Sequence, residues 1–368
     1  MKKSKAHIKH FVKKHRLYVF LVAFSVLGLT ALLVTSAATF SISVEPETTA
    51  PSNLVINDQT ASGAKAVQFG TATQTGGLRP FPDTIYGITT ESVEQLSSLV
   101  DSLDRHTKMP TTRIVFQDGM NVSEYTSAVN QMYPKSYIMG EILDSTGLES
   151  ISVENYRTRA RNFVNAFSSK VDVWEIGNEL NGEWVGQPAD IRAKAQAAYD
   201  VVEKENASLN LRSAVTLNYW PSSDCYLYSW EDTLTFARAM PTEVKNGVDY
   251  VLLSFYETCG YPDVPSIRPT DQQFISIFDQ LKTIFPNAKI GMGEIGAQGK
   301  DDDLPSNPSL SEKQTIANRY YGMHNALKTA LGTRYVGGYF WWYYYQDAVP
   351  YNRSQSMWQT IEDNFNSY

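Results

Sequence analysis

Short apolar segments alternate with amphipathic helical patterns through most of this chain, and no other feature of the sequence restricts the fold as strongly. Such an alternation is typical of a parallel sheet covered by helices. Each segment is short and apolar, as expected of strands that are covered on both sides. Eight candidate strands can be counted: Thr84–Ile88, Arg113–Phe116, Tyr137–Glu141, Val171–Gly177, Arg212–Leu217, Tyr250–Phe255, Lys289–Met292 and Gly337–Trp342.

Eight strand–helix units predict an α/β fold of the (β/α)8 or TIM barrel type over residues 81–368. The intervening helical patterns, such as SVEQLSSLVDSLDR and DQQFISIFDQLKTIF, often begin with Ser, Asp or Pro, which favour the first turn of a helix. An open, doubly wound sheet is the alternative. It is disfavoured because no predicted strand is followed by Gly-x-Gly-x-x-Gly or by a phosphate-binding loop.

The first 40 residues predict a membrane-targeting segment. Residues 1–16 contain seven Lys and Arg and no acid, and residues 17–44 carry no charge. The basic end is expected to stay in the cytoplasm while the rest of the chain is exported. The apolar run matches the roughly 20 residues of a transmembrane helix, so we expect a single-pass cell-membrane protein with its barrel outside. Cleavage near Ser36-Ala37-Ala38 is the alternative and would give a secreted protein.

Residues 41–80 are rich in Thr, Ser, Ala and Gly and predict a flexible linker. When the seven basic residues of the N-terminal tail are set aside from the total of 32, 25 Lys and Arg remain against 39 Asp and Glu. An acidic domain without a basic stripe argues against nucleic acid as a partner. We expect a monomer that acts on a neutral or weakly charged substrate.

The few histidines and cysteines restrict the available chemistry. Three of the five histidines lie in the basic tail, which leaves His106 and His324 for the folded part. These are too few for a His-rich metal site, and neither follows a strand as a Ser-His-Asp hydrolase would need, so no metal and no cofactor are expected. Cys225 and Cys259 follow the fifth and sixth predicted strands. Export predicts a disulfide between them at the barrel rim, with two free thiols as the alternative.

Two glutamates stand at the ends of predicted strands, where the function of a barrel of this kind is located. Glu179 follows the fourth strand in VDVWEIGNEL, and Glu294 ends the seventh in KIGMGEIG. These strands face each other across the barrel, so the two side chains can converge on one ligand. Cleavage of a glycosidic bond with retention of configuration needs two carboxyl groups about 5–5.5 Å apart, whereas inversion needs roughly 6.5–9.5 Å. Mutual repulsion raises the pKa of one of them, which then holds the proton for the leaving group.

WEIGNE, the glutamate that ends the seventh strand and the aromatic segment GGYFWWYYYQD together resemble the clan A retaining barrel glycoside hydrolases, the superfamily of cellulases, mannanases and β-xylosidases. The resemblance covers roughly residues 81–368. It implies that Glu179 is the general acid/base and Glu294 the nucleophile. It also implies that Asn178 binds the 2-hydroxyl group of the sugar.

The same resemblance implies three further substrate-binding residues. Arg113 matches an arginine that keeps the nucleophile ionised, since a nearby cation lowers the pKa of a carboxyl group. Tyr256 matches an aromatic hydroxyl near the nucleophile, and Trp342, with Trp341 as the alternative, matches a ring that stacks under the sugar. An ordinary strand-edge arginine and simple barrel packing are the competing interpretations of Arg113 and Tyr256. The third strand ends in EILDST, without the His or Asn often found there in relatives, so the family within the clan stays open.

Other acids and aromatic residues lie near predicted strand ends. Glu175, inside the fourth strand, is expected in a buried polar network. The others could contact substrate, but a structural role is expected for each: Glu141, Glu183 and Glu257 among the acids, and Trp184, Trp220, Tyr343, Tyr344 and Tyr345 among the aromatic residues.

The predicted function is retaining hydrolysis of a β-linked polysaccharide or oligosaccharide by double displacement. One alternative is a cell-surface barrel that binds a glycan without cutting it, and another is a transglycosylase that uses the same residues. The first is disfavoured because two facing carboxylates repel each other and a binding module has no need of them.

Overall fold

The computed structural model describes residues 55–57, 65–67, 78–258, 266–298 and 308–368. The chain divides into two compact units, Met1–Thr73 and Gln74–Tyr368. In the first, strands β1 (Val55–Asn57) and β2 (Lys65–Val67) form an antiparallel pair within the range predicted as a linker. The predicted membrane segment, residues 1–40, lies outside the described residues. None of the helices in the described ranges is long and apolar enough to cross a membrane.

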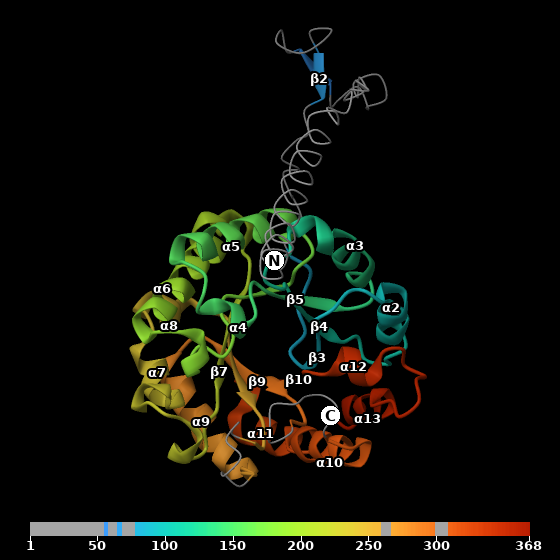
Figure 1. Ribbon diagram of the computed structural model, residues 1–368, viewed down its shortest axis with the longest axis vertical. Coiled ribbons are helices and arrows are strands. Elements are labelled where there is room, and N and C mark those ends of the chain that lie inside the picture. Colours follow the sequence, from blue (N-terminus) through green and yellow to red (C-terminus); the bar gives the residue numbers. More distant parts are fainter. Residues whose placement is uncertain (1–54, 58–64, 68–77, 259–265, 299–307) are drawn as a thin grey trace, which may run out of the picture. The chain divides into compact units, whose positions relative to one another are not determined.

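The second unit is a closed barrel of eight parallel strands (Figure 1). The strands follow one another in chain order around the barrel, and the last pairs with the first. All eight predicted strands are confirmed, and the open-sheet alternative is wrong. The strands are β3 (Ile85–Thr90), β4 (Thr111–Val115), β5 (Tyr137–Glu141), β6 (Val173–Glu175), β7 (Ser213–Asn218), β8 (Tyr250–Phe255), β9 (Lys289–Ile295) and β10 (Tyr335–Trp341).

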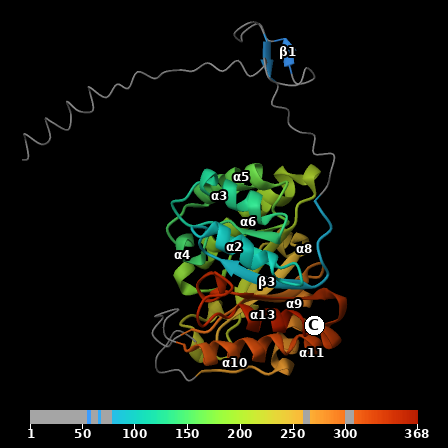
Figure 2. The same cartoon turned by 90° about the vertical axis from the view of Figure 1, so that its right-hand side faces the viewer.

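Helices surround the barrel on its outer side (Figures 1 and 2). Ser152, which begins one of the predicted helical patterns, is the N-cap of a helix, and Thr270 and Ser309 cap two others just before the predicted starts; each accepts a hydrogen bond from a backbone N–H of the first helical turn. The helices are α2 (Leu96–Asp104), α3 (Val122–Met132), α4 (Ser145–Leu148), α5 (Val153–Phe167), α6 (Pro188–Tyr199), α7 (Thr233–Ala239), α8 (Thr242–Gly247), α9 (Asp271–Ile284), α10 (Leu310–Tyr321), α11 (His324–Leu331), α12 (Tyr344–Ala348) and α13 (Trp358–Phe365).

Apolar side chains fill the lower part of the barrel interior. This inner cluster comprises Ile85, Met139, Val173, Ala214, Tyr250, Leu252, Val336 and Phe340. A larger apolar core lies between the strands and the helices. Below the inner cluster, Arg79 donates hydrogen bonds of 2.8 and 2.6 Å to the two carboxylate oxygens of Asp172.

Candidate active site

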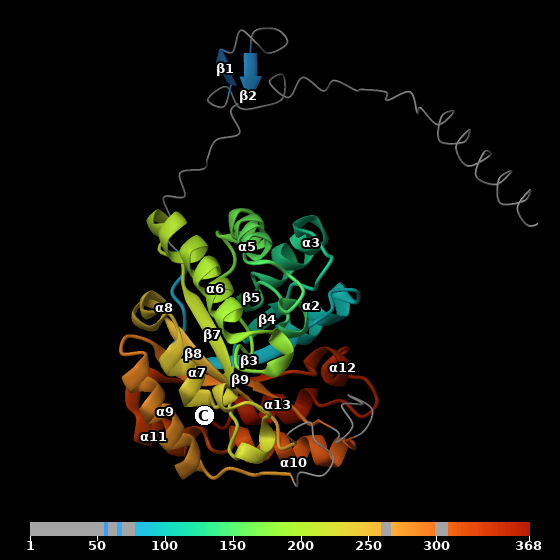
Figure 3. The same cartoon turned by 60° about the vertical axis from the view of Figure 1, so that its left-hand side comes forward.

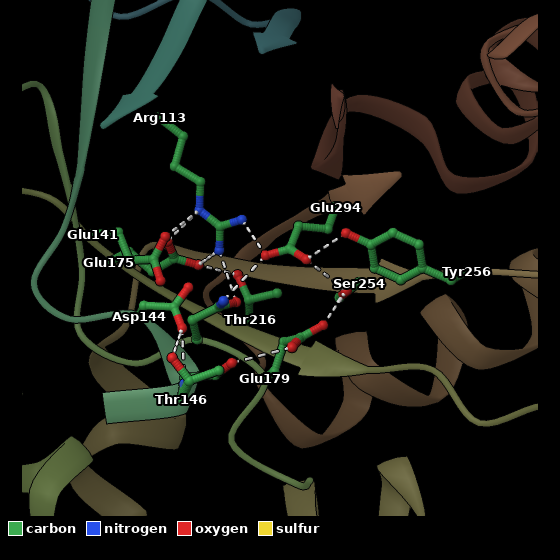
Figure 4. Close-up of polar contacts among 12 residues, drawn as sticks. Arg113, Glu141, Asp144, Thr146, Glu175, Glu179, Thr216, Ser254, Tyr256 and Glu294 are labelled. Atoms are coloured by element: carbon green, nitrogen blue, oxygen red, sulfur yellow. Dashed lines mark hydrogen bonds and ion pairs between the residues drawn. The ribbon is translucent and has the colours of Figure 1, made fainter. Parts of the chain in front are cut away.

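A cavity of about 360 Å³ lies at the carboxyl ends of the barrel strands. The loops after most of the strands contribute to its walls, so residues that are distant in sequence meet there. Five of the six predicted catalytic and substrate-binding residues line it. The sixth, Arg113, is fully buried and contacts Glu294 (Figure 4). The five are Asn178, Glu179, Tyr256, Glu294 and Trp342.

A β-bulge turns Glu294 towards the cavity. Met292 packs outward into the core between the strands and the helices. Because side chains two residues apart in a regular strand point to the same side, Glu294 would also point outward in a regular strand. The register between β8 and β9 shifts at this point, so that Gly293 has no partner on β8. The shift brings Glu294 inside and returns Ile295 to the outer core. A Cβ atom on Gly293 would lie 2.8 Å from Cγ2 of Thr216, so the bulge requires glycine.

Four hydrogen-bond donors surround the carboxylate of Glu294. Arg113 donates to Oε1 at 2.5 Å, and the amide of Asn178 donates to the same atom at 3.1 Å. The hydroxyl groups of Tyr256 and Ser254 donate to Oε2 at 3.0 and 3.2 Å. A carboxyl group that is surrounded only by hydrogen-bond donors has all its contacts satisfied as the carboxylate anion.

Arg113 connects the carboxylates beneath the cavity. Its guanidinium donates to both oxygens of Glu175, at 2.6 and 2.5 Å, and to Oδ1 of Asn178 at 2.7 Å. Burial by itself lowers the pKa of Arg113, but the charges of Glu175, Glu141 and Glu294 outweigh this and hold it well above its usual value. Arg113 is therefore a permanent cation that fixes the position of Glu294.

Glu141 differs from the other carboxyl groups around Arg113. Its side chain is fully buried, and neither of its oxygens has a hydrogen-bond partner, although Oε2 lies 3.2 Å from Nε of Arg113. Burial raises the pKa of Glu141 well above its usual value. Burial also raises the pKa of Glu175, but Arg113 and the hydroxyl group of Thr216 counteract this by donating to it. Glu141 is therefore the carboxyl group of this cluster whose ionised form receives the least stabilisation from hydrogen-bond donors.

Glu179 sits at a sharp turn after β6. Its φ angle of 50° lies in the left-handed region, which costs a residue other than glycine about 1–2 kcal/mol. Oε1 lies 2.5 Å from the hydroxyl oxygen of Ser254, and Oε2 accepts a hydrogen bond of 3.3 Å from Ser145. Trp184 orients Ser145 by donating to its oxygen at 3.1 Å. Burial, reinforced by the charge of Glu294, raises the pKa of Glu179 well above its usual range.

The hydroxyl group of Ser254 bridges Glu179 and Glu294. The distance between the nearest oxygens of the two carboxyl groups cannot exceed the sum of the two hydrogen-bond lengths. That sum is shorter than the separation of the two carboxyl groups in inverting glycosidases, which is roughly 6.5–9.5 Å. A hydroxyl group has a single hydrogen to donate. All three groups are satisfied when a protonated Glu179 donates to Ser254 and Ser254 donates to Glu294.

No family model matches this sequence, and no curated protein matches it either. Solved structures do match its fold. The glycoside hydrolase family 5 enzyme PbGH5A from Prevotella bryantii B14 superimposes with a TM-score of 0.53 at 14% identity, over 79% of this chain and 95% of that chain. A mutant of that enzyme in complex with a xyloglucan tetradecasaccharide gives a TM-score of 0.52 at 12% identity, over 86% of this chain and 96% of that chain. The endo-beta-mannanase/endo-beta-glucanase PbGH26A-GH5A of the same bacterium gives 0.53 at 13% identity, over 79% of this chain and 48% of that chain.

The chain has the fold of the barrel glycoside hydrolases. The resemblance that the sequence motifs indicated is thereby confirmed at the level of the fold. In this barrel, as in barrels of this fold generally, the cavity lies at the carboxyl ends of the strands.

The structure separates the two candidate tryptophans of this barrel. Trp341 is fully buried, and its indole N–H donates to Asp347 at 3.0 Å on the helix side of β10. Trp342 lines the cavity, with its ring 5.6 Å from the guanidinium carbon of Arg113. Trp184 and Trp220 also line the cavity, and their rings meet edge to face at 6.3 Å. Trp342 is therefore placed to stack on a sugar, and Trp341 is a structural residue.

The remaining candidates divide between the cavity and the core. Glu183 and Tyr343 line the cavity. Tyr344 is buried and contacts Nε2 of His106 at 2.9 Å, and the hydroxyl of Tyr345 accepts a hydrogen bond from the backbone of Gln95. Glu257 forms ion pairs with two arginines, Arg268 and Arg319.

Cys225 lines the cavity, is buried and is not a free cysteine. Its predicted partner Cys259 lies outside the described residues, so the pairing stays a prediction. Within the described ranges, no group of three or more His, Cys, Asp or Glu could hold a metal ion.

Sequence reasoning did not identify Ser254 or Ser145. The signal for Ser254 was present, because alternate residues of a strand share one face, and Tyr256 was already expected to point inside. Ser145 carried no such signal, since it is the first residue of the short helix α4 after β5 and its contact with Glu179 depends on how that segment folds.

Proposed function

We propose that this protein hydrolyses β-linked glycans with retention of configuration. Glu179 is the general acid/base and Glu294 the nucleophile. The proposal rests above all on the bridge through Ser254, which keeps two carboxyl groups close together in different surroundings. One of them is surrounded by donors, and the pKa of the other is raised, as double displacement requires.

The reaction has two steps. Glu294 attacks the anomeric carbon while the bond to the leaving oxygen breaks, and Glu179 gives its proton to that oxygen. The resulting glycosyl ester neutralises Glu294, so Glu179, now ionised, loses the repulsion that raised its pKa. Glu179 then takes a proton from water, the water oxygen attacks the anomeric carbon, and the ester bond to Glu294 breaks.

The surrounding residues support both steps. Arg113 and Asn178 hold Glu294 in the attacking position, and Asn178 can turn its amide to a sugar hydroxyl group. Tyr256 donates to the oxygen of Glu294 that does not contact Arg113. Trp342 offers an apolar face to the sugar ring at the centre of the cavity.

The test is hydrolysis by the full-length protein of a panel of β-linked glucans, mannans, xylans and galactans, with NMR of the first product formed. We expect the β-anomer to appear first. Glu294→Ala should reduce the rate by at least about 10⁴-fold, since no other nucleophile is available. The exposed Glu154→Ala serves as the matched control and should not change the rate.

Initial release of the α-anomer, or equal activity of Glu294→Ala and the wild type, would contradict the mechanism. Binding of a glycan without any cleavage would favour the glycan-binding alternative. Transfer products at high sugar concentration would show that a sugar captures the same intermediate, as in a transglycosylase.

We also propose that the barrel acts outside the cell membrane, with residues 1–40 as an anchor, or as a cleaved signal in a secreted form, and that Cys225 pairs with Cys259. The pattern of charge and hydropathy supports the first proposal. The buried, non-free Cys225 at the barrel rim supports the second. Protease treatment of intact cells tests the location, and mass spectrometry of peptides under non-reducing conditions tests the pairing.

A further inference from the structure

The segment between β7 and α7, both labelled in Figure 3, carries an exposed hydrophobic surface. Among the described residues, the large hydrophobic side chains that are strongly exposed are those of Met109, Leu227 and Tyr228. Two of these are neighbours in this one segment, with 64% of Leu227 and 54% of Tyr228 exposed. Grouped exposed apolar side chains beside a cavity often mark a ligand contact.

Two neighbouring residues, Trp230 and Glu231, fix the position of the surface formed by Leu227 and Tyr228. The ring of Trp230 lies nearly parallel to that of Tyr228, at 8° with centroids 6.0 Å apart, and also contacts Phe236 of the core. The buried carboxyl group of Glu231 accepts hydrogen bonds from the backbone N–H groups of Leu227 and Tyr228, at 3.1 and 2.6 Å. A ring that is already fixed loses little freedom when a ligand binds.

The segment that carries this surface also contributes to the wall of the cavity. Trp220 and Cys225 belong to the same segment and line the cavity. Asn181, two residues after Glu179, donates to the backbone oxygens of Asn218 and Glu231 at 3.0 and 2.6 Å. The exposed surface is thereby tied to the loop that carries the general acid.

We propose that Leu227 and Tyr228 form a distal subsite that binds further sugar units of the same glycan, outside the cavity. This rests on the proposed function and deepens it, because the substrate is then a polysaccharide or a long oligosaccharide. The apolar C–H face of a pyranose stacks on an aromatic ring such as that of Tyr228.

The surroundings of this surface indicate which ligand it accepts. The nearby charged residues of the segment, Asp224, Glu231 and Asp232, are all acidic, which suits a neutral sugar better than a uronate. A protein partner would normally bury about 800 Å² on each side, far more than two side chains can supply.

The experiment compares the full-length wild type with Tyr228→Ala on two substrates of the same linkage. One is the best-cleaved polysaccharide, and the other is the shortest oligosaccharide that the wild type cleaves. We expect kcat/KM on the polysaccharide to fall about tenfold, mainly through KM, and kcat/KM on the short substrate to stay unchanged. Tyr228→Trp should behave as the wild type. Met109→Ala, which removes an exposed side chain just before β4 at the opposite end of the barrel, is the matched control.

Equal kcat/KM of Tyr228→Ala and the wild type on the polysaccharide would overturn the subsite, as would an equal loss on both substrates. A change in sedimentation with unchanged kinetics would also overturn it and would indicate contact between two copies of the chain. If the wild type cleaves nothing, the proposed function itself fails. Retention of Glu294→Ala and of the Glu294→Ala/Tyr228→Ala double variant on the insoluble polysaccharides then decides the subsite separately, and equal retention would overturn it.

Discussion

Glu141 and Glu175 lie directly opposite each other on β5 and β6, and both face Nε of Arg113. Only Glu175 receives hydrogen bonds, from Arg113 and from Thr216. One buried cation therefore faces three carboxyl groups, those of Glu141, Glu175 and Glu294 (Figure 4). The pKa of Glu141 is raised, which favours its neutral form, and that form would reduce the excess of negative charge.

If Glu141 carries a proton, the substitutions Glu141→Gln and Glu175→Gln should have different effects on stability and activity. Glu141→Gln replaces a neutral group by a neutral group of the same shape, so kcat should stay within about threefold. Glu175→Gln removes the main partner of Arg113, which should destabilise the fold by about 3–5 kcal/mol and reduce kcat by about 100-fold, because Glu294 loses its fixed neighbour. Urea unfolding and steady-state kinetics measure both effects. Equal losses in the two variants would show that Glu141 is ionised.

Ser254→Ala should move the basic limb of the kcat/KM profile to higher pH. Once Glu179 is ionised, Ser254 can donate its single hydrogen to it; this hydrogen bond stabilises the anion and so lowers the pKa of Glu179. Without it the pKa rises further, and Glu179 stays protonated to a higher pH. Ser213→Ala, a buried serine at the start of β7 far from the cavity, is the control. A basic limb that stays in place or moves to lower pH would contradict the role given to Ser254.

Glu179→Gln should stabilise the protein at neutral pH while it abolishes activity. The pKa of Glu179 is raised in the folded state, so the unfolded chain releases this proton at a lower pH than the folded chain. Stability is therefore lost as the pH rises above the ordinary glutamate value, at up to about 1.4 kcal/mol per pH unit, until the folded group ionises too. Urea unfolding at pH 4, 5.5 and 7 should show a growing advantage of the variant. A constant difference would argue against the raised pKa.

Substitution of Trp341, the last residue of β10, and of Trp342, which follows it, should have different effects. Trp342→Ala should reduce kcat/KM by about 100-fold with little effect on unfolding, because this ring faces the cavity. Trp341→Ala should lower the free energy of unfolding by about 3–5 kcal/mol, because that ring is fully buried and its indole N–H donates a hydrogen bond to Asp347. Thermal unfolding combined with kinetics separates the two. Loss of stability in Trp342→Ala without loss of activity would reverse the assignment.

The sequence alone determined the eight strands and the candidate pair of glutamates. Strand periodicity is a local property, which is why Tyr137–Glu141 and Tyr250–Phe255 were predicted with the bounds that the structure has. The ends of strands four and seven also follow from chain order, because strands of a barrel succeed one another around a circle. Glu179 and Glu294 could therefore be expected in one cavity before any contact was known.

Only the tertiary structure decided how those glutamates meet. The bulge at Gly293 turns Glu294 inward, and it exists only in the register between β8 and β9. The bridge through Ser254 and the lack of hydrogen bonds to Glu141 likewise depend on side chains from different strands. A pKa depends on burial and on charges within a few ångströms, and these distances are fixed by strand register and loop packing rather than by local sequence.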